Sequence, residues 1–159
     1  MKIGSIVVPL LAWIMLKGQS NSWDMSWGIN ENEEGVLLIY AVPESDVFVY
    51  SFTCKGKAVT LEYNHDTFDN VPGGTKYPIQ VKVRLRRETM TLPAMATFEG
   101  MGNPWISTSI ADPSHFFRAM LKAQNISTRD RWGKNETPTP PRALVVQFSS
   151  RCGFALATK

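Results

Sequence analysis

Alternating apolar and polar residues predict β-strands along most of this chain, and the clearest example is residues 79–86. Every second residue there is branched and apolar, and the residues between are Gln80, Lys82, Arg84 and Arg86. Because successive side chains of a strand point to opposite faces, we expect one face of this strand to be buried and the other to be exposed and basic.

Two adjacent runs of β-branched and aromatic residues predict a hairpin. The runs are residues 47–54 and 58–63, and the connecting Lys55-Gly56-Lys57 has the composition of a tight turn. Other apolar runs predict further strands at residues 36–42, one or two short strands within 89–98 where Pro93 limits regular pairing, and strands at 105–110 and 126–132.

One segment has the pattern of an amphipathic helix, expected near residues 113–124. Asp112 can accept hydrogen bonds from the first-turn amides, and Pro113 suits the first helical position. The apolar residues that follow at helical spacing form a stripe for packing on a sheet: Phe116, Phe117, Met120 and Leu121.

Chain length and composition indicate one globular domain. The chain has 159 residues, of which 43% are hydrophobic and 19% charged. Residues 134–142 are expected to form a loop, and residues 143–152 either a strand or a short helix. We therefore expect a mainly β fold, an antiparallel sheet or sandwich of about 7–8 strands with one packed helix, within residues 23–159.

The N-terminal segment has the composition of a signal peptide. Lys2 precedes an apolar run over residues 3–16, which is too short to span a bilayer comfortably. We expect cleavage after Ser22, which would leave a periplasmic or secreted protein without a membrane span; an uncleaved anchor is the alternative. Loss of residues 1–22 would reduce the net charge from +3 to about +1, so general basicity does not support nucleic-acid binding.

Two cysteines, Cys54 and Cys152, are expected to form a disulfide, because an exported chain with an even number of cysteines usually pairs them. The alternative is a reactive or metal-bound thiol. The absence of Cys-x-x-Cys spacing makes that alternative the weaker one.

The basic strand face is the candidate binding surface, with Lys82, Arg84 and Arg86 as candidate partner-binding residues. Lys76 and Arg87 lie near them in the sequence. Such a face either contacts an acidic protein or an anionic envelope polymer, or is a solvated surface that resists aggregation. No aromatic residue is interleaved with these cations, so single-stranded nucleic acid is not expected as the partner.

Catalytic and metal-binding patterns are weak. His65, beside Asp66, is expected to be a solvated loop residue, and His115 a surface or packing residue at the start of the helix. Asp69 and Asn70 lie near His65, but the segment lacks the spacing of a calcium loop. We expect no metal site, no cofactor and no enzymatic activity.

The order of these features resembles the periplasmic VasI-type proteins associated with type VI secretion, and a group of uncharacterised alphaproteobacterial exported proteins. The similar features within residues 23–153 are an early Trp, a strand ending at Cys54 before a basic-glycine turn, the basic face of residues 81–86, and an apolar segment ending at Cys152. The resemblance implies an accessory role in the cell envelope and assigns no catalytic residues.

Three hypotheses on function follow. The first is an exported, non-enzymatic accessory or binding protein that presents a sheet face to an envelope partner. The second is a small secreted inhibitor of a lytic enzyme, with residues 64–76 as the inhibitory loop. The third and weakest is a small hydrolase that uses His65 and Asp66. The sequence leaves the oligomeric state and the identity of the partner open.

Overall fold

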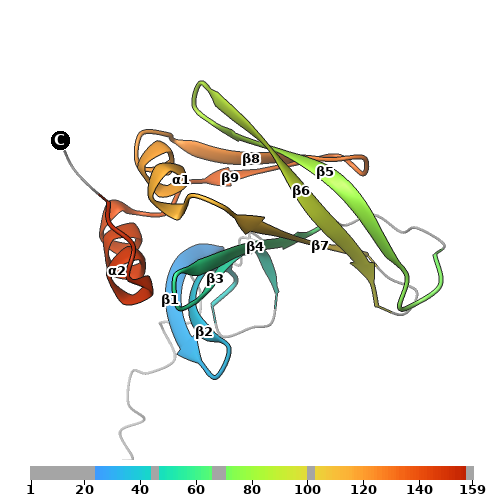
Figure 1. Ribbon diagram of the computed structural model, residues 1–159, viewed down its shortest axis with the longest axis horizontal. Helices are drawn as coiled ribbons and strands as arrows, with labels where there is room; N and C mark the ends of the chain where they lie inside the picture. Colours follow the sequence, from blue (N-terminus) through green and yellow to red (C-terminus); the bar gives the residue numbers. More distant parts are fainter. Residues whose placement is uncertain (1–23, 44–46, 66–70, 100–102, 157–159) are drawn as a thin grey trace, which may run out of the picture.

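The computed structural model describes residues 24–43, 47–65, 71–99 and 103–156, and Figure 1 shows their arrangement. The expected signal peptide, residues 1–22, lies outside this part of the chain. Within it, no helix is long and apolar enough to cross a membrane.

The described residues form one antiparallel sheet and two helices. Along the sheet the strand order is β1-β2-β3-β4-β7-β6-β5-β8-β9, so most sequence neighbours are also neighbours in space. The elements are β1 (Ser26–Asn32), β2 (Gly35–Ala41), β3 (Phe48–Lys55), β4 (Ala58–Asn64), β5 (Lys76–Leu85), β6 (Glu88–Phe98), β7 (Pro104–Ile110), α1 (Pro113–Met120), β8 (Asn125–Arg129), β9 (Lys134–Pro138) and α2 (Arg142–Cys152).

The sheet curls until its two edge strands approach each other (Figure 1). The indole Nε1–H of Trp27 on β1 donates a hydrogen bond of 2.8 Å to the carbonyl of Pro138 on β9. Inside the curl, the Tyr50 hydroxyl of β3 lies 2.8 Å from Thr128 Oγ1 of β8. The curl gives the sheet a concave inner face that encloses the core and an outer face that meets solvent.

Alternation along the strands explains which residues form the core. Val81 and Val83 of β5 and Leu61 of β4 are fully buried, while the residues between them point outward. The hairpin predicted from two apolar runs is confirmed as β3 and β4, in register from Tyr50 opposite Tyr63. The mainly β prediction is likewise confirmed, as a single curled sheet.

Helix α1 covers one end of the curl. The Asp112 carboxylate accepts a 2.9 Å hydrogen bond from the His115 N–H, and Pro113 occupies the first turn, as predicted. Phe116 and Phe117 are buried against Phe52 of β3. The helix ends at Met120, with Leu121 as its C-cap, which is earlier than the expected residue 124.

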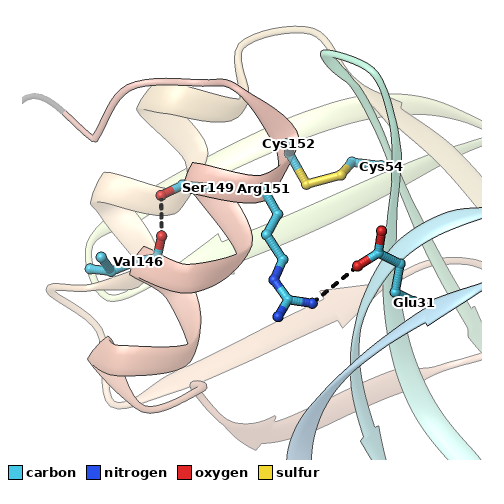
Figure 2. The surroundings of a disulfide bond; sticks show 6 residues. All are labelled: Glu31, Cys54, Val146, Ser149, Arg151 and Cys152. Atoms are coloured by element: carbon cyan, nitrogen blue, oxygen red, sulfur yellow. Dashed lines mark hydrogen bonds and ion pairs between the residues drawn. A yellow bond between two sulfur atoms is a disulfide. The ribbon is translucent and has the colours of Figure 1, made fainter.

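Helix α2 is joined to the sheet by the predicted disulfide between Cys54 and Cys152, whose Cα atoms lie 5.9 Å apart (Figure 2). The bridge closes a loop of 98 residues in sequence separation. In the chain-entropy model, such a loop stabilises the folded state by about 4–5 kcal/mol. Arg151 pairs with Glu31 of β1 at 3.2 Å on the same side of the helix (Figure 2).

Three expectations on local structure were wrong or incomplete. Residues 134–142, expected to be a loop, contain β9, because pairing with β8 satisfies the backbone of these polar residues. Residues 143–152, left open between strand and helix, are helical. Strand β6 runs without interruption through Pro93, which lies before the β6–β7 pairing begins at Met95.

Candidate functional site

The outer face of β5 presents the three predicted partner-binding residues. Val81, Val83 and Leu85 fix the inward side of the strand, so Lys82 and Arg84 point outward and are exposed. Arg86 follows in the β5–β6 turn with a φ of 56°, in the left-handed region that few side chains adopt. The Arg84 Nε–H donates to the Arg86 carbonyl at 3.4 Å, which links the two guanidinium-bearing residues.

Strands β8 and β9 extend this surface with cations that the sequence reasoning missed. Lys82 lies opposite Arg129 of β8, and Arg129 lies opposite Lys134 of β9. Three cations therefore form a row across three strands. Like charges directly opposite each other destabilise a sheet, so this row needs a reason other than folding.

The neighbouring row contains one acid. Arg84 lies opposite Ser127, and Ser127 lies opposite Glu136. Glu136 forms an ion pair with Lys134 and accepts a 3.1 Å hydrogen bond from the Asn125 amide. The hydrogen bond and charge of Lys134 lower the pKa of Glu136, so this carboxylate is ionised and offsets part of the positive charge.

These residues surround a surface hollow of about 720 Å³, here called the basic hollow. Among the described residues, four cations and one acid line it. The full lining is Arg84, Arg86, Lys122, Gln124, Asn125, Ser127, Lys134 and Glu136. Its volume falls in the range of small-ligand sites, and its amide, hydroxyl and cationic groups are all hydrogen-bond donors suited to an anion.

The other predicted cations are placed differently. Lys82 lies on the same face without lining the hollow, and Lys76 stands at the opposite end of β5. Arg87 is exposed in the β5–β6 turn and also does not line the hollow. Of the three candidate residues, Arg84 and Arg86 therefore line the hollow, and Lys82 does not.

His65 is not the solvated loop residue that we expected. It is 4% exposed, and its Nε2 lies 2.7 Å from Asp130 Oδ2. The Tyr63 hydroxyl donates to the same oxygen at 2.7 Å, and the Trp132 N–H donates to Oδ1 at 2.8 Å. The partner Asp130 is 65 residues away in the sequence, so the sequence held no local signal of this network.

The network favours an ionised Asp130. Burial alone would raise the pKa of Asp130, but hydrogen bonds from His65, Tyr63 and the Trp132 N–H outweigh burial and lower it. An ionised carboxylate only accepts, so the His65 Nε2–H donates. Burial, followed by the hydrogen bond to Asp130, raises the pKa of Tyr63 and keeps its hydroxyl protonated.

The network fits a structural role. The Asp130 side chain is 0% exposed and that of His65 is 5% exposed, so a substrate has little access to either group. The network joins the end of β4 to the turn between β8 and β9, and an Asn135 amide hydrogen bond of 2.9 Å to the Asn64 carbonyl strengthens this junction. Asp66, the proposed partner of His65, lies outside the described residues.

The second histidine of the chain, His115, lies in the first turn of α1. His115 is half-exposed, as expected for a helix-start surface residue, and its Nε2 lies 3.2 Å from Glu88 Oε2. In the described part of the chain, no group of three His, Cys, Asp or Glu residues could hold a metal ion. Asp69 and Asn70 lie outside that part.

Comparison of the chain with models of known protein families, with curated proteins and with solved structures found no match. The feature of the described residues most suited to a partner is the basic face, defined as Lys82, Arg84, Arg86, Lys122, Arg129 and Lys134.

Proposed function

We propose that this protein is an exported, non-enzymatic binding protein of the cell envelope that holds an anionic partner on its basic face. The observation that carries the proposal is the row of Lys82, Arg129 and Lys134 beside the basic hollow. Bringing these cations together costs folding free energy, and an anionic partner would recover that cost on binding.

The disulfide supports the exported location. Cys54 and Cys152 are each 3% exposed and bonded to one another, and such bonds persist mainly in oxidising compartments. The predicted signal peptide agrees with the same location. The resemblance to VasI-type proteins would make a secretion-system component one such partner.

Charge reversal tests the proposal directly. We expect Lys82→Glu/Arg84→Glu/Arg86→Glu to weaken binding of inorganic polyphosphate at least tenfold, about 1.4 kcal/mol, because three attractive charges become repulsive. Isothermal titration at low salt measures this effect. Wild-type binding should also weaken steeply as salt is added, since the charges are exposed.

A matched control carries the same change in net charge elsewhere. Lys55→Glu/Lys57→Glu/Lys76→Glu alters exposed residues that do not line the hollow and should retain most of the affinity. Equal losses in the two triple variants would refute a specific face. Cross-linking of the wild type in a native envelope, followed by mass spectrometry, then identifies the partner; capture that survives charge reversal of the face would also contradict the proposal.

A further inference from the structure

A second hollow, of about 770 Å³, lies between α1 and α2 beside the start of β6. We call it the helical groove. Its apolar residues include Leu121, Val146, Phe154 and Leu156, and its cations include Arg118 and Arg142. It therefore combines an apolar surface with a positively charged rim.

The apolar surface of the groove is open to solvent. Val146 is 46% exposed and points away from the side of α2 that bears Arg151 and the disulfide (Figure 2). Leu121, Phe154 and Leu156 are half-buried beside it. Exposed apolar residues that gather in a hollow with charged edges are typical of a binding site.

The two hollows adjoin. Lys122 lines both of them, the β5–β6 turn contributes Arg86 to the basic hollow, and Glu88, two residues later at the start of β6, lines the helical groove. A ligand that filled both would have its charged part among Arg84, Arg86 and Lys122. Its apolar part would then lie along Val146 and Leu156.

We infer that the ligand of the basic face is an amphiphile, with a phosphate-type anionic head in the basic hollow and an alkyl chain in the helical groove. This inference rests on the proposed function, and it names the chemical class of the partner. Charge complementarity selects the head: the cations that line the basic hollow outnumber its acid, and the Glu88 carboxylate of the groove is paired with His115. The apolar lining selects the chain.

A series of n-alkyl phosphates tests the inference. Butyl, hexyl, octyl and decyl phosphate carry one head group and differ in chain length, and each is used below its micelle concentration. Each methylene buried in the groove should strengthen binding about two- to fourfold, as expected for transfer of a methylene out of water. Isothermal titration of the full chain, with inorganic phosphate as the head group alone, measures this gain.

Variants of the helical groove test the contribution of the alkyl chain separately from that of the head group. Val146→Ser/Leu156→Ser removes apolar surface without adding charge, and Ser150→Trp fills the groove from an exposed position on α2. We expect both to reduce the gain per methylene to less than about twofold. The matched control is Val47→Ser, because Val47 is 47% exposed and does not line the groove.

Variants of the head site complete the design. Arg84→Glu/Arg86→Glu should weaken every member of the series by a similar factor and leave the gain per methylene unchanged. If these two substitutions do not change the affinity for any member of the series, the binding site is purely apolar. That result would overturn the inference that both hollows bind one ligand.

The outcomes distinguish this inference from the proposed function. If polyphosphate binds through the basic face but chain length has no effect on alkyl phosphates, the amphiphile is wrong and the proposed function stands. If the wild-type protein binds neither polyphosphate nor any alkyl phosphate, both the inference and the proposed function are refuted. If the gain in affinity per methylene is equal in the wild type and in the groove variants, the alkyl chain binds elsewhere and the inference is wrong.

Discussion

At the scale of single residues, the Asp130 carboxylate is the centre of a buried hydrogen-bond network. Its carboxylate accepts hydrogen bonds from Tyr63, His65 and the Trp132 N–H at 2.7 to 2.8 Å. Hydrogen bonds to a buried charge contribute more than neutral ones, and a buried charge without partners is costly. The folded junction between β4 and the β8–β9 turn therefore depends on this ionised group.

The first prediction at this scale concerns Tyr63→Phe. The change removes one hydroxyl and leaves the aromatic ring in place, and should lower the free energy of unfolding by about 1.5–3 kcal/mol at pH 7. Urea denaturation measures it. Tyr50→Phe is the control, because the Tyr50 hydroxyl bonds to the neutral Thr128 and its loss should cost about 0.5–1.5 kcal/mol.

The same pair of proteins tests the pH dependence. The pKa of Asp130 is lowered in the folded state, so the stability that its ionisation contributes is present above the unfolded pKa of about 3.9. That stability is lost as the pH falls through the folded pKa. The difference between wild type and Tyr63→Phe should therefore shrink below about pH 4, and a difference that stays constant from neutral to strongly acidic pH would contradict the role of the charge.

At the scale of elements, the start of α1 shows how a local signal fixes a helix that the core then orients. Asp112 caps the first turn, and Phe116 and Phe117 bury the inner side of the helix. At its other end the helix closes with hydrogen bonds from the Lys122 and Ala123 N–H groups to the Ala119 and Met120 carbonyls, before the chain enters β8. The helix begins where the sequence predicts and ends earlier.

We predict that Asp112→Ala lowers the free energy of unfolding by about 1 kcal/mol, because the His115 N–H loses its acceptor at the helix start. Asp112→Asn should retain most of the stability, since an Asn side chain caps nearly as well. Thermal and urea denaturation of the two variants compare them. Equal losses for Ala and Asn would indicate that the charge, and not the cap, stabilises the helix.

At the scale of the whole molecule, the curl of the sheet places its basic face and the two hollows at neighbouring positions. Strands β8 and β9 follow α1 in the sequence, yet β8 pairs with β5 at the other side of the β5–β6 hairpin. This crossover sets Arg129 beside Lys82 and Lys134. Functional sites in proteins are commonly formed at the expense of folding stability.

This cost gives a prediction in which stability and binding change in opposite directions. Arg129→Thr should raise the free energy of unfolding by about 0.5–1 kcal/mol at low salt, because it removes like-charge contacts with Lys82 and Lys134. It should weaken polyphosphate binding at the same time. The control Lys76→Thr replaces a cation that lies opposite the neutral Thr97 and should change neither quantity much.

Salt distinguishes the origin of the gain. Added salt screens exposed charges, so the extra stability of Arg129→Thr should decline as salt rises. A gain that is independent of salt would instead reflect the strand preference of threonine. A loss of stability at every salt concentration would contradict the expected repulsion of Arg129 by Lys82 and Lys134.

Features that depend on neighbouring residues could be predicted from the sequence. Alternation over residues 79–86 predicted both the buried side of β5 and the exposed Lys82 and Arg84, because a strand repeats every two residues. Asp112 and Pro113 located the helix start for the same kind of local reason. Two cysteines in a chain that was expected to be exported were enough to predict their bond.

Which strands pair, and therefore where the candidate site forms, could not be predicted from local sequence patterns. His65 was misjudged because its partner Asp130 reaches it through the turn between β8 and β9, and Arg129 and Lys134 joined the basic face through pairing with β5 and β8. Strand order and register follow from how the whole sheet buries its inner face, a property of all strands together. Local patterns therefore specify the elements and their faces, while the packing of the complete core brings the charged residues of distant elements together.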